Sequence, residues 1–171
     1  MRRSIVGTWL LLGGLFAGEV GAAPRRLAPA ERAEITSLAR RVMELVRDGA
    51  RDPSGIFPTP AELRVVFGLR DPGDAGPDGG GMVVRRQLEA LERDARDLRP
   101  RLAGAQFRGI AGPSYVRNTI DPRRCGRYAA PGSQCVDGPV VEYAVGGSVR
   151  RFRIDTLVRV GGRWRVLDLR P

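Results

Sequence analysis

Three stretches of this chain repeat apolar residues with the spacing of an α-helix. The first covers residues 29–48, where Pro29 suits a first helical position because its missing N–H is not needed there. Gly49 follows and favours the left-handed conformation that commonly ends a helix. The apolar residues on one face are Ile35, Leu38, Val42, Leu45 and Val46. The pattern predicts an amphipathic helix over residues 29–48.

Two further helices are indicated by their boundaries as well as their apolar faces. Thr59, Pro60 and Glu62 have the spacing of a capping box with proline at the first position, and Gly68 ends this short helix. The next helix begins near Met82 and ends before Pro100, since the residue preceding a proline avoids the helical region. The apolar residues are Leu63, Val66 and Phe67 in the short helix and Val84, Leu88, Leu91, Ala95 and Leu98 in the long one.

The second half of the chain has the alternation of β-strands. Residues 105–112 and 114–120 are short candidates, and residues 139–145, 149–160 and 163–170 are clearer ones. Gly161 and Gly162 separate the last two, which predicts a closing β-hairpin. Together these patterns predict an α+β fold, in which amphipathic helices pack on a curved antiparallel sheet of about 4–5 strands.

Alternation divides the strand 149–160 into two faces. The predicted core face holds Phe152, Ile154, Thr156, Val158 and Val160, and the predicted solvent face holds Arg151, Arg153, Asp155, Leu157 and Arg159. Asp155 is therefore expected beside an arginine. In the last strand the apolar side changes after Val166. Either a bulge shifts the faces there or both faces of the strand end are covered.

The amino terminus has a different character. Two arginines precede an apolar run over residues 5–17, and the small residues Gly21, Ala22 and Ala23 follow, as in a secretory signal peptide cleaved after Ala22. The run is shorter than the about 20 residues that a membrane span needs, which disfavours a membrane anchor. We expect a signal peptide over 1–22, a tether over 23–28 and one domain over 29–171, exported to the periplasm or outside the cell. A twin-arginine export route stays open.

The charge of the chain is strongly positive. It has 29 basic residues, all arginine, against 19 acidic ones, a net charge of +10. Removing 1–22 takes away Arg2, Arg3 and Glu19 and leaves +9. An exported protein rarely meets nucleic acid, so we expect an anionic envelope component or a protein as partner. The possible anion-binding face comprises Arg151, Arg153, Arg159, Arg163 and Arg165. Equally, the charge could serve solubility alone.

Two cysteines, Cys125 and Cys135, are the only ones in the chain. In an oxidising compartment such neighbours usually pair, so we expect a structural Cys125–Cys135 disulfide. A redox pair would favour a shorter spacing, and a metal site would need further ligands in a chain without histidine. Residues 70–81, rich in glycine and aspartate, are expected to form a flexible loop, because they match neither a calcium loop nor a phosphate loop. The sequence predicts no metal and no cofactor.

The closing hairpin resembles that of the nuclear transport factor 2-like superfamily, a cone-shaped α+β fold. The matching residues are Thr156, Leu157, Gly161, Gly162, Trp164, Arg165 and Val166. The amphipathic helix 29–48 also fits, whereas a long third helix before nearly all the strands departs from the familiar order. The resemblance implies a curved sheet with a concave mouth. Members of this superfamily that use a histidine base cannot be matched, because the chain has no histidine. Members that use an aspartate with a tyrosine could be matched only through Asp155, Asp168, Tyr115, Tyr128 or Tyr143.

These observations favour a small exported binding or interaction domain without catalysis. Its ligand would be anionic or a small apolar molecule, held in the concave mouth or on the arginine face. An accessory subunit of a cell-envelope assembly is one alternative. A cone-fold enzyme that uses a carboxylate in an apolar pocket is another.

Overall fold

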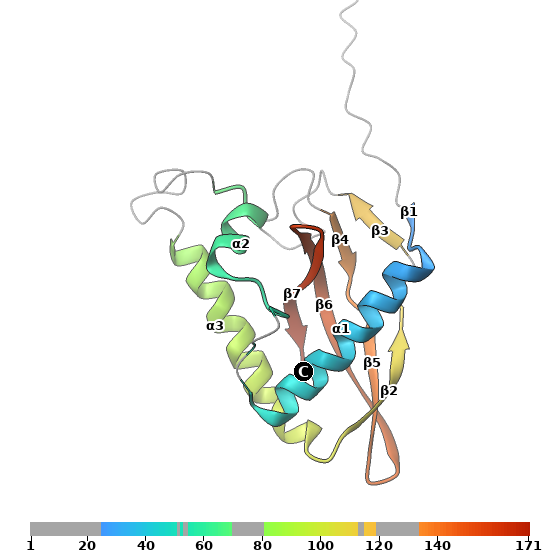
Figure 1. The fold of residues 1–171 in the computed structure, drawn as a ribbon. Coiled ribbons are helices and arrows are strands. Elements are labelled where there is room, and N and C mark those ends of the chain that lie inside the picture. The colour runs from blue at the N-terminus through green and yellow to red at the C-terminus, as the bar shows by residue number, and fades with distance from the viewer. Residues whose placement is uncertain (1–24, 51, 53–54, 70–80, 113–114, 119–133) are drawn as a thin grey trace, which may run out of the picture.

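The computed structural model describes residues 25–50, 52, 55–69, 81–112, 115–118 and 134–171. In these residues, helices pack on an antiparallel sheet, which confirms the predicted α+β class (Figure 1). The helices are α1 (Pro29–Asp48), α2 (Pro60–Val66), α3 (Gly81–Leu98) and the 3-10 helix η1 (Arg99–Leu102). The strands are β1 (Arg25–Arg26), β2 (Gln106–Ala111), β3 (Tyr115–Asn118), β4 (Gln134–Asp137), β5 (Val140–Val145), β6 (Ser148–Val160) and β7 (Arg163–Arg170).

The helix boundaries follow the local signals in the sequence. The backbone N–H of Ala28 donates to Glu31 Oε2 (3.0 Å) at the start of α1, and Gly49 adopts φ 63° at its end. At α2, Glu62 N donates to Thr59 Oγ1 (3.2 Å) while Thr59 N donates to Glu62 Oε2 (2.8 Å). The predicted capping box is therefore confirmed, because each residue satisfies a backbone donor that the helix leaves free.

The long strand β6 organises the sheet. On one edge it pairs with β5 and then with β4, in an unbroken register from Ser148 to Val158. β2 pairs with β5 and β3 with β4, while β1 pairs with β3 and β7 pairs with the other edge of β6. β3 lies beside β4 and β2 beside β5, so the sheet is five strands wide, in the order β1-β3-β4-β6-β7. This agrees with the predicted four to five strands.

Two bulges shift the faces of the β6–β7 hairpin. Ile154 lies opposite Leu169 and Leu157 opposite Val166, but Thr156 lies opposite Asp168, which leaves Asp155 and Leu167 as extra residues in their strands. The bulge predicted for the last strand is thus confirmed. The prediction of simple alternation along 149–160 is wrong beyond Asp155, because the bulge rotates the following residues by one position.

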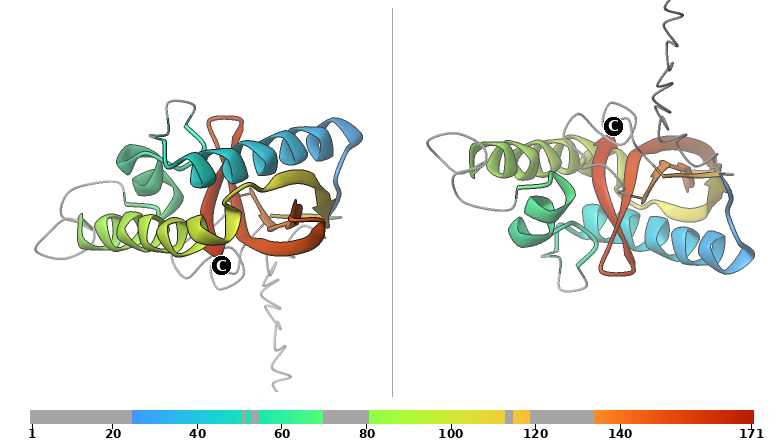
Figure 2. Two further views of the ribbon diagram at one scale, coloured as in Figure 1. Left: turned by 90° about the horizontal axis from the view of Figure 1, so that it is seen from below. Right: turned by 90° about the horizontal axis from the view of Figure 1, so that it is seen from above.

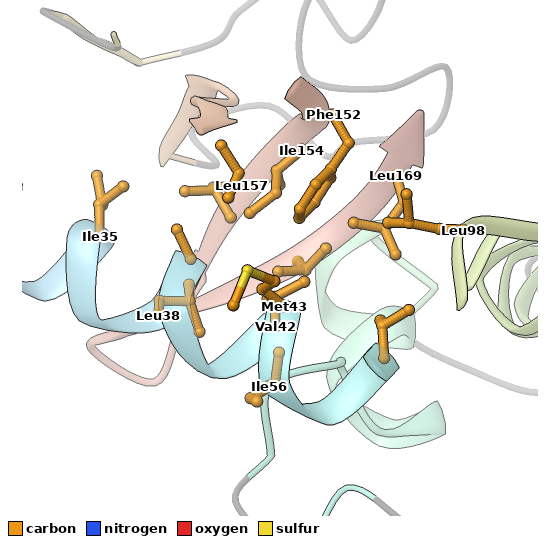
Figure 3. Close-up of a cluster of buried hydrophobic side chains, with 14 of the residues drawn as sticks. Ile35, Leu38, Val42, Met43, Ile56, Leu98, Phe152, Ile154, Leu157 and Leu169 are labelled. Atoms are coloured by element: carbon orange, nitrogen blue, oxygen red, sulfur yellow. The ribbon is translucent and has the colours of Figure 1, made fainter. Parts of the chain in front are cut away.

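The main core lies between α1 and the sheet. Ile35, Leu38, Val42 and Met43 of α1 face Phe152, Ile154 and Leu157 of β6 and Leu169 of β7, and Leu98 of α3 closes one side (Figure 3). Leu157, which alternation assigned to the solvent face, is completely buried there. The hairpin therefore contributes side chains from both strands to a core that α1 covers.

A second apolar cluster covers the other side of the hairpin end. It consists of Leu63 and Val66 of α2, Val84 of α3, Cys135 of β4, Val158 of β6 and Leu167 of β7. Gln87 of α3 also donates from Nε2 to the carbonyl of Leu167 at the bulge (2.6 Å). Both faces of the end of β7 are covered and a bulge is present, so both explanations for the change of apolar side in the last strand are correct. Figure 2 shows α1 across one face of the sheet, with α2 and α3 beside β7.

Two strands were not predicted from the sequence, and two predicted segments lie wholly or mostly outside the described residues. Arg25 and Arg26, expected in a tether, form β1 on the edge of β3. β4 (Gln134–Asp137) was not among the predicted strands. The signal peptide over 1–22 and most of the loop 70–81 lie outside the described residues, except Gly81, which begins α3. None of the helices in the described ranges is long and apolar enough to cross a membrane.

Candidate ligand-binding site

The predicted arginine face does not form one surface. Arg151 and Arg153 lie on the outer face of β6, and each pairs with a carboxylate. The Arg151 guanidinium contacts Glu142 Oε1 from Nη2 (2.7 Å), and Arg153 Nε contacts Asp155 Oδ1 (3.1 Å). Asp155 also accepts from Arg170 Nη2 (2.7 Å), which confirms that it lies beside arginines. These pairs are exposed on the arginine side and contribute little to stability.

Arg159 lies on the opposite side, because the bulge at Asp155 turns it toward α1. Its guanidinium contacts Glu31 Oε1 (3.2 Å), and its centre lies 5.7 Å from the ring centre of Trp164. Arg165 points to α2, where Nε and Nη2 contact Glu62 Oε1 at 3.0 and 2.9 Å. Arg163 is exposed at the hairpin turn. Four of the five arginines are therefore engaged with carboxylates of the chain.

Glu31 joins three parts of the fold. It accepts from both terminal nitrogens of Arg25 (2.6 Å each), from the backbone of Ala28 and from Arg159. The hydrogen bonds from Arg25 lower the pKa of Glu31 to about 2, despite an opposing effect of burial. Its charge thus fastens β1 and β6 to the start of α1, and this part of the basic surface acts within the fold.

A cavity of about 490 Å³ opens between the second half of α1, α3 and the residues Ala50, Asp52 and Phe57. This volume is in the range of small-molecule sites. Its wall is apolar over most of its residues and charged at four positions. The apolar lining residues are Leu45, Val46, Ala50, Phe57, Leu88, Leu91 and Ala95, and the charged ones are Asp52, Glu92, Arg96 and Arg99.

The charged residues of the cavity differ in their bonding. Asp52 Oδ2 accepts from the backbone N–H of Phe57 (2.7 Å), which holds these two lining residues together. Arg99 Nε donates to the carbonyl of Val46 (3.2 Å) and so holds the end of α1 against η1. Arg96 and Glu92 lie one turn apart on the exposed side of α3. Two of the four charges therefore shape the cavity, and the other two can contact a ligand or solvent.

The sequence contains only an indirect signal for this cavity. Leu88, Leu91 and Ala95 belong to the apolar stripe of α3 that was expected to be core, and Leu91 is indeed buried. Leu88 and Ala95 are half-buried, because α1 does not fill the space beside them. A gap between two helices depends on their separation and crossing, which no spacing of residues in either helix specifies.

The carboxylates suggested for catalysis do not line this cavity. Burial, together with the neighbouring charges of Asp155 and Asp94, raises the pKa of Asp168. Tyr143 is fully buried, and neither its hydroxyl nor the indole N–H of Trp164 finds a partner within the described residues. Tyr143 pairs with Arg150 and Asp168 with Thr156, six residues further along β6, or about 20 Å. An aspartate–tyrosine pair is therefore not assembled from these two residues.

The structure describes one of the two cysteines. Cys135 is buried in β4 and is not a free cysteine, while Cys125 lies outside the described residues, so the disulfide stays a prediction. Tyr128 also lies outside them. Across the described ranges, no group of three or more potential ligands could hold a metal ion. Comparison with family models, curated proteins and solved structures finds no match to this chain.

Proposed function

We propose that this chain is a small exported binding domain without catalysis of its own, and that it holds a ligand with an apolar body between α1 and α3. The cavity of about 490 Å³ in that position is the observation that carries the proposal. Export rests on the character of residues 1–22 alone. The resemblance of the hairpin to a fold that hosts many binding modules is consistent with this proposal but adds only an analogy.

The lining supports an apolar ligand rather than a highly charged one. Seven of the eleven lining residues are apolar, and the four charged ones comprise two acids and two arginines. Burial of apolar surface would contribute most of the affinity, at roughly 25 cal/mol per Å² before the cost of association. Arg96 and Glu92 would then select among ligands by their polar ends.

Binding is favoured over catalysis by the place of the carboxyl groups. A general acid or base needs a shifted pKa and access to the substrate. Asp168 has the raised pKa but is not in the cavity wall, whereas Asp52 is in the wall but is bonded to the backbone of Phe57. The carboxyl group with the raised pKa therefore lies outside the cavity wall.

Titration of the chain from Ala23 onward with 1-anilinonaphthalene-8-sulfonate tests this proposal, followed by displacement with short linear alkanols and alkanoates. That chain contains every described residue. We expect saturable binding of one probe molecule and its displacement by the apolar competitors. Absence of saturable binding in the folded protein would overturn the proposal.

The variant Ala95→Phe places a ring in the cavity and should weaken probe binding by about tenfold or more, because it removes volume that the ligand needs. Ala33→Phe is the matched control, since Ala33 is exposed on α1 outside the lining. Equal binding by both variants would show that the probe binds elsewhere. Far-UV circular dichroism establishes that each variant is folded.

A further inference from the structure

The β5–β6 hairpin projects beyond the rest of the sheet. β7 pairs with β6 only as far as the Arg153–Arg170 pair, and β2 pairs with β5 only as far as the Gln106–Ala144 pair. Beyond the β2 pairing, only the Val145–Ser148 pair and the Gly146–Gly147 turn remain as a short two-stranded ribbon. Figure 1 shows this ribbon extending past η1 and the start of β2. Whatever meets this end of the molecule meets the hairpin tip first.

The tip carries an exposed apolar residue. The first residues of β6 are all exposed, and Val149 among them has 64% of its surface accessible. A single exposed valine is ordinary on a protein surface. Its position is less ordinary, because it lies two residues after the Gly146–Gly147 turn of the projecting hairpin and is followed directly by Arg150 and Arg151 in the sequence.

Four arginines lie at one level of the sheet near the hairpin tip, and we name them the tip arginines: Arg101, Arg108, Arg150 and Arg151. Val149 and Arg151 leave one face of β6, and Arg150 leaves the other. Arg150 lies opposite Tyr143 and Arg151 opposite Glu142, and Arg108 is the bulge residue of β2 beside the same two residues of β5. Arg101 of η1 donates from Nη2 to the carbonyl of Arg151 (3.4 Å). Arg108 and the pair Arg150–Arg151 lie on the two strands that flank β5, so their Cα atoms are about 10 Å apart, within reach of long side chains.

The charge of the tip is largely uncompensated. Arg151 pairs with Glu142, but Arg101, Arg108 and Arg150 have no carboxylate partner within the described residues. They differ in this from Arg153, Arg159 and Arg165, which have one each. A projecting hairpin with arginines on both faces and an exposed aliphatic side chain near its turn matches an anionic lipid surface, where the charges meet headgroups and the apolar residue enters the interface.

We propose that the β5–β6 hairpin tip attaches this protein to an anionic lipid surface. This inference goes beyond the proposed binding function, because it does not involve the cavity and requires no ligand in it. A lipid bilayer is favoured over an anionic polysaccharide because Val149 has nothing to contact in a hydrated chain of sugars. Each uncompensated arginine should strengthen attachment by about fivefold at low salt.

Sedimentation with vesicles tests the proposal, using the chain from Ala23 onward. We expect it to bind vesicles that contain phosphatidylglycerol and to remain in solution with pure phosphatidylcholine. Binding should weaken as salt increases, because salt screens exposed charges. Absence of binding to the anionic vesicles at low salt would overturn the proposal and leave the cavity proposal untouched.

Variants locate the contact. Arg108→Gln with Arg150→Gln should reduce the partition coefficient by about thirtyfold, since two uncompensated charges are lost. The matched control is Arg85→Gln with Arg86→Gln, an exposed pair at the far end of α3, which should change binding by less than about twofold. Equal losses in both double variants would show a response to net charge alone and would overturn the proposal.

Val149→Ser separates lipid from other anions. It should weaken vesicle binding several-fold while leaving retention on immobilised heparin unchanged, because only the bilayer offers an apolar interior. Unchanged vesicle binding by this variant would contradict insertion and favour a polyanion as the partner.

Discussion

Gly138 connects β4 to β5 and lies opposite Asp155 of β6. Its N–H donates to the carbonyl of Asp155 (2.8 Å), and a Cβ atom added here would overlap the carbonyl group of Ile154. The obstacle is backbone, which cannot rotate away as a side chain can. The short contact therefore makes glycine a requirement of the strand pairing at this residue.

Gly138→Ala should consequently lower the free energy of unfolding by about 3 kcal/mol or more, measured by urea denaturation. Gly109→Ala in β2 is the control, since an added Cβ meets nothing within 4 Å there, and its effect should be close to zero. A Gly138→Ala protein as stable as the control would show that β4 and β5 do not approach β6 in this way.

Glu31 gives a prediction for pH. Its pKa is about 2 in the folded protein and about 4.5 without its partners, so the folded state favours the charged form. The resulting stabilisation is present above about pH 4.5 and is lost as pH falls toward 2, and we expect it to be about 1–2 kcal/mol after solvent screening. Glu31→Gln should remove this part of the pH dependence of urea denaturation. Glu34→Gln, at an exposed position of the same helix, should retain it.

At the scale of elements, the paired bulges decide which side chains of the closing hairpin are buried. Alternation and the turn glycines predicted both strands of the hairpin, because these signals act between neighbouring residues. The position of the bulge in β6 could not be predicted in this way. It depends on Asp155 and Leu167 being accommodated together when β6 and β7 pair.

Leu157→Ala tests the bulge directly. With simple alternation Leu157 would be on the solvent face and its truncation would have little effect. The structure buries it completely, so we expect a loss of about 2–5 kcal/mol in the free energy of unfolding. Val149→Ala in the same strand is the control, with an expected change within about 0.5 kcal/mol because Val149 is exposed.

At the scale of the whole molecule, two apolar clusters share the β6–β7 hairpin. α1 covers one side of it, and α2 with the first half of α3 covers the other. Because the same two strands contribute to both clusters, loss of either should expose the other. The domain is therefore expected to unfold in one cooperative transition.

The chain from Ala23 onward contains a single tryptophan, Trp164, which is buried in the main core. Its fluorescence reports on this core, whereas far-UV circular dichroism reports on all the helices and strands. In urea, the two signals should give the same midpoint and the same slope. Separate midpoints would show that the second cluster, with α2 and the first half of α3, unfolds independently of the main core.

The sequence by itself determined the three helices, the capping box at Thr59 and Glu62, the α+β class and the closing hairpin. Helical spacing, capping boxes and glycine turns act over a few residues, so they can be recognised without knowing what packs on them. Tertiary structure decided the rest: the burial of Leu157, the carboxylate partners of Arg159 and Arg165, and the cavity between α1 and α3. Each of these depends on where separate elements meet. The distances between elements are set by the packing of the whole chain and by no local pattern within it.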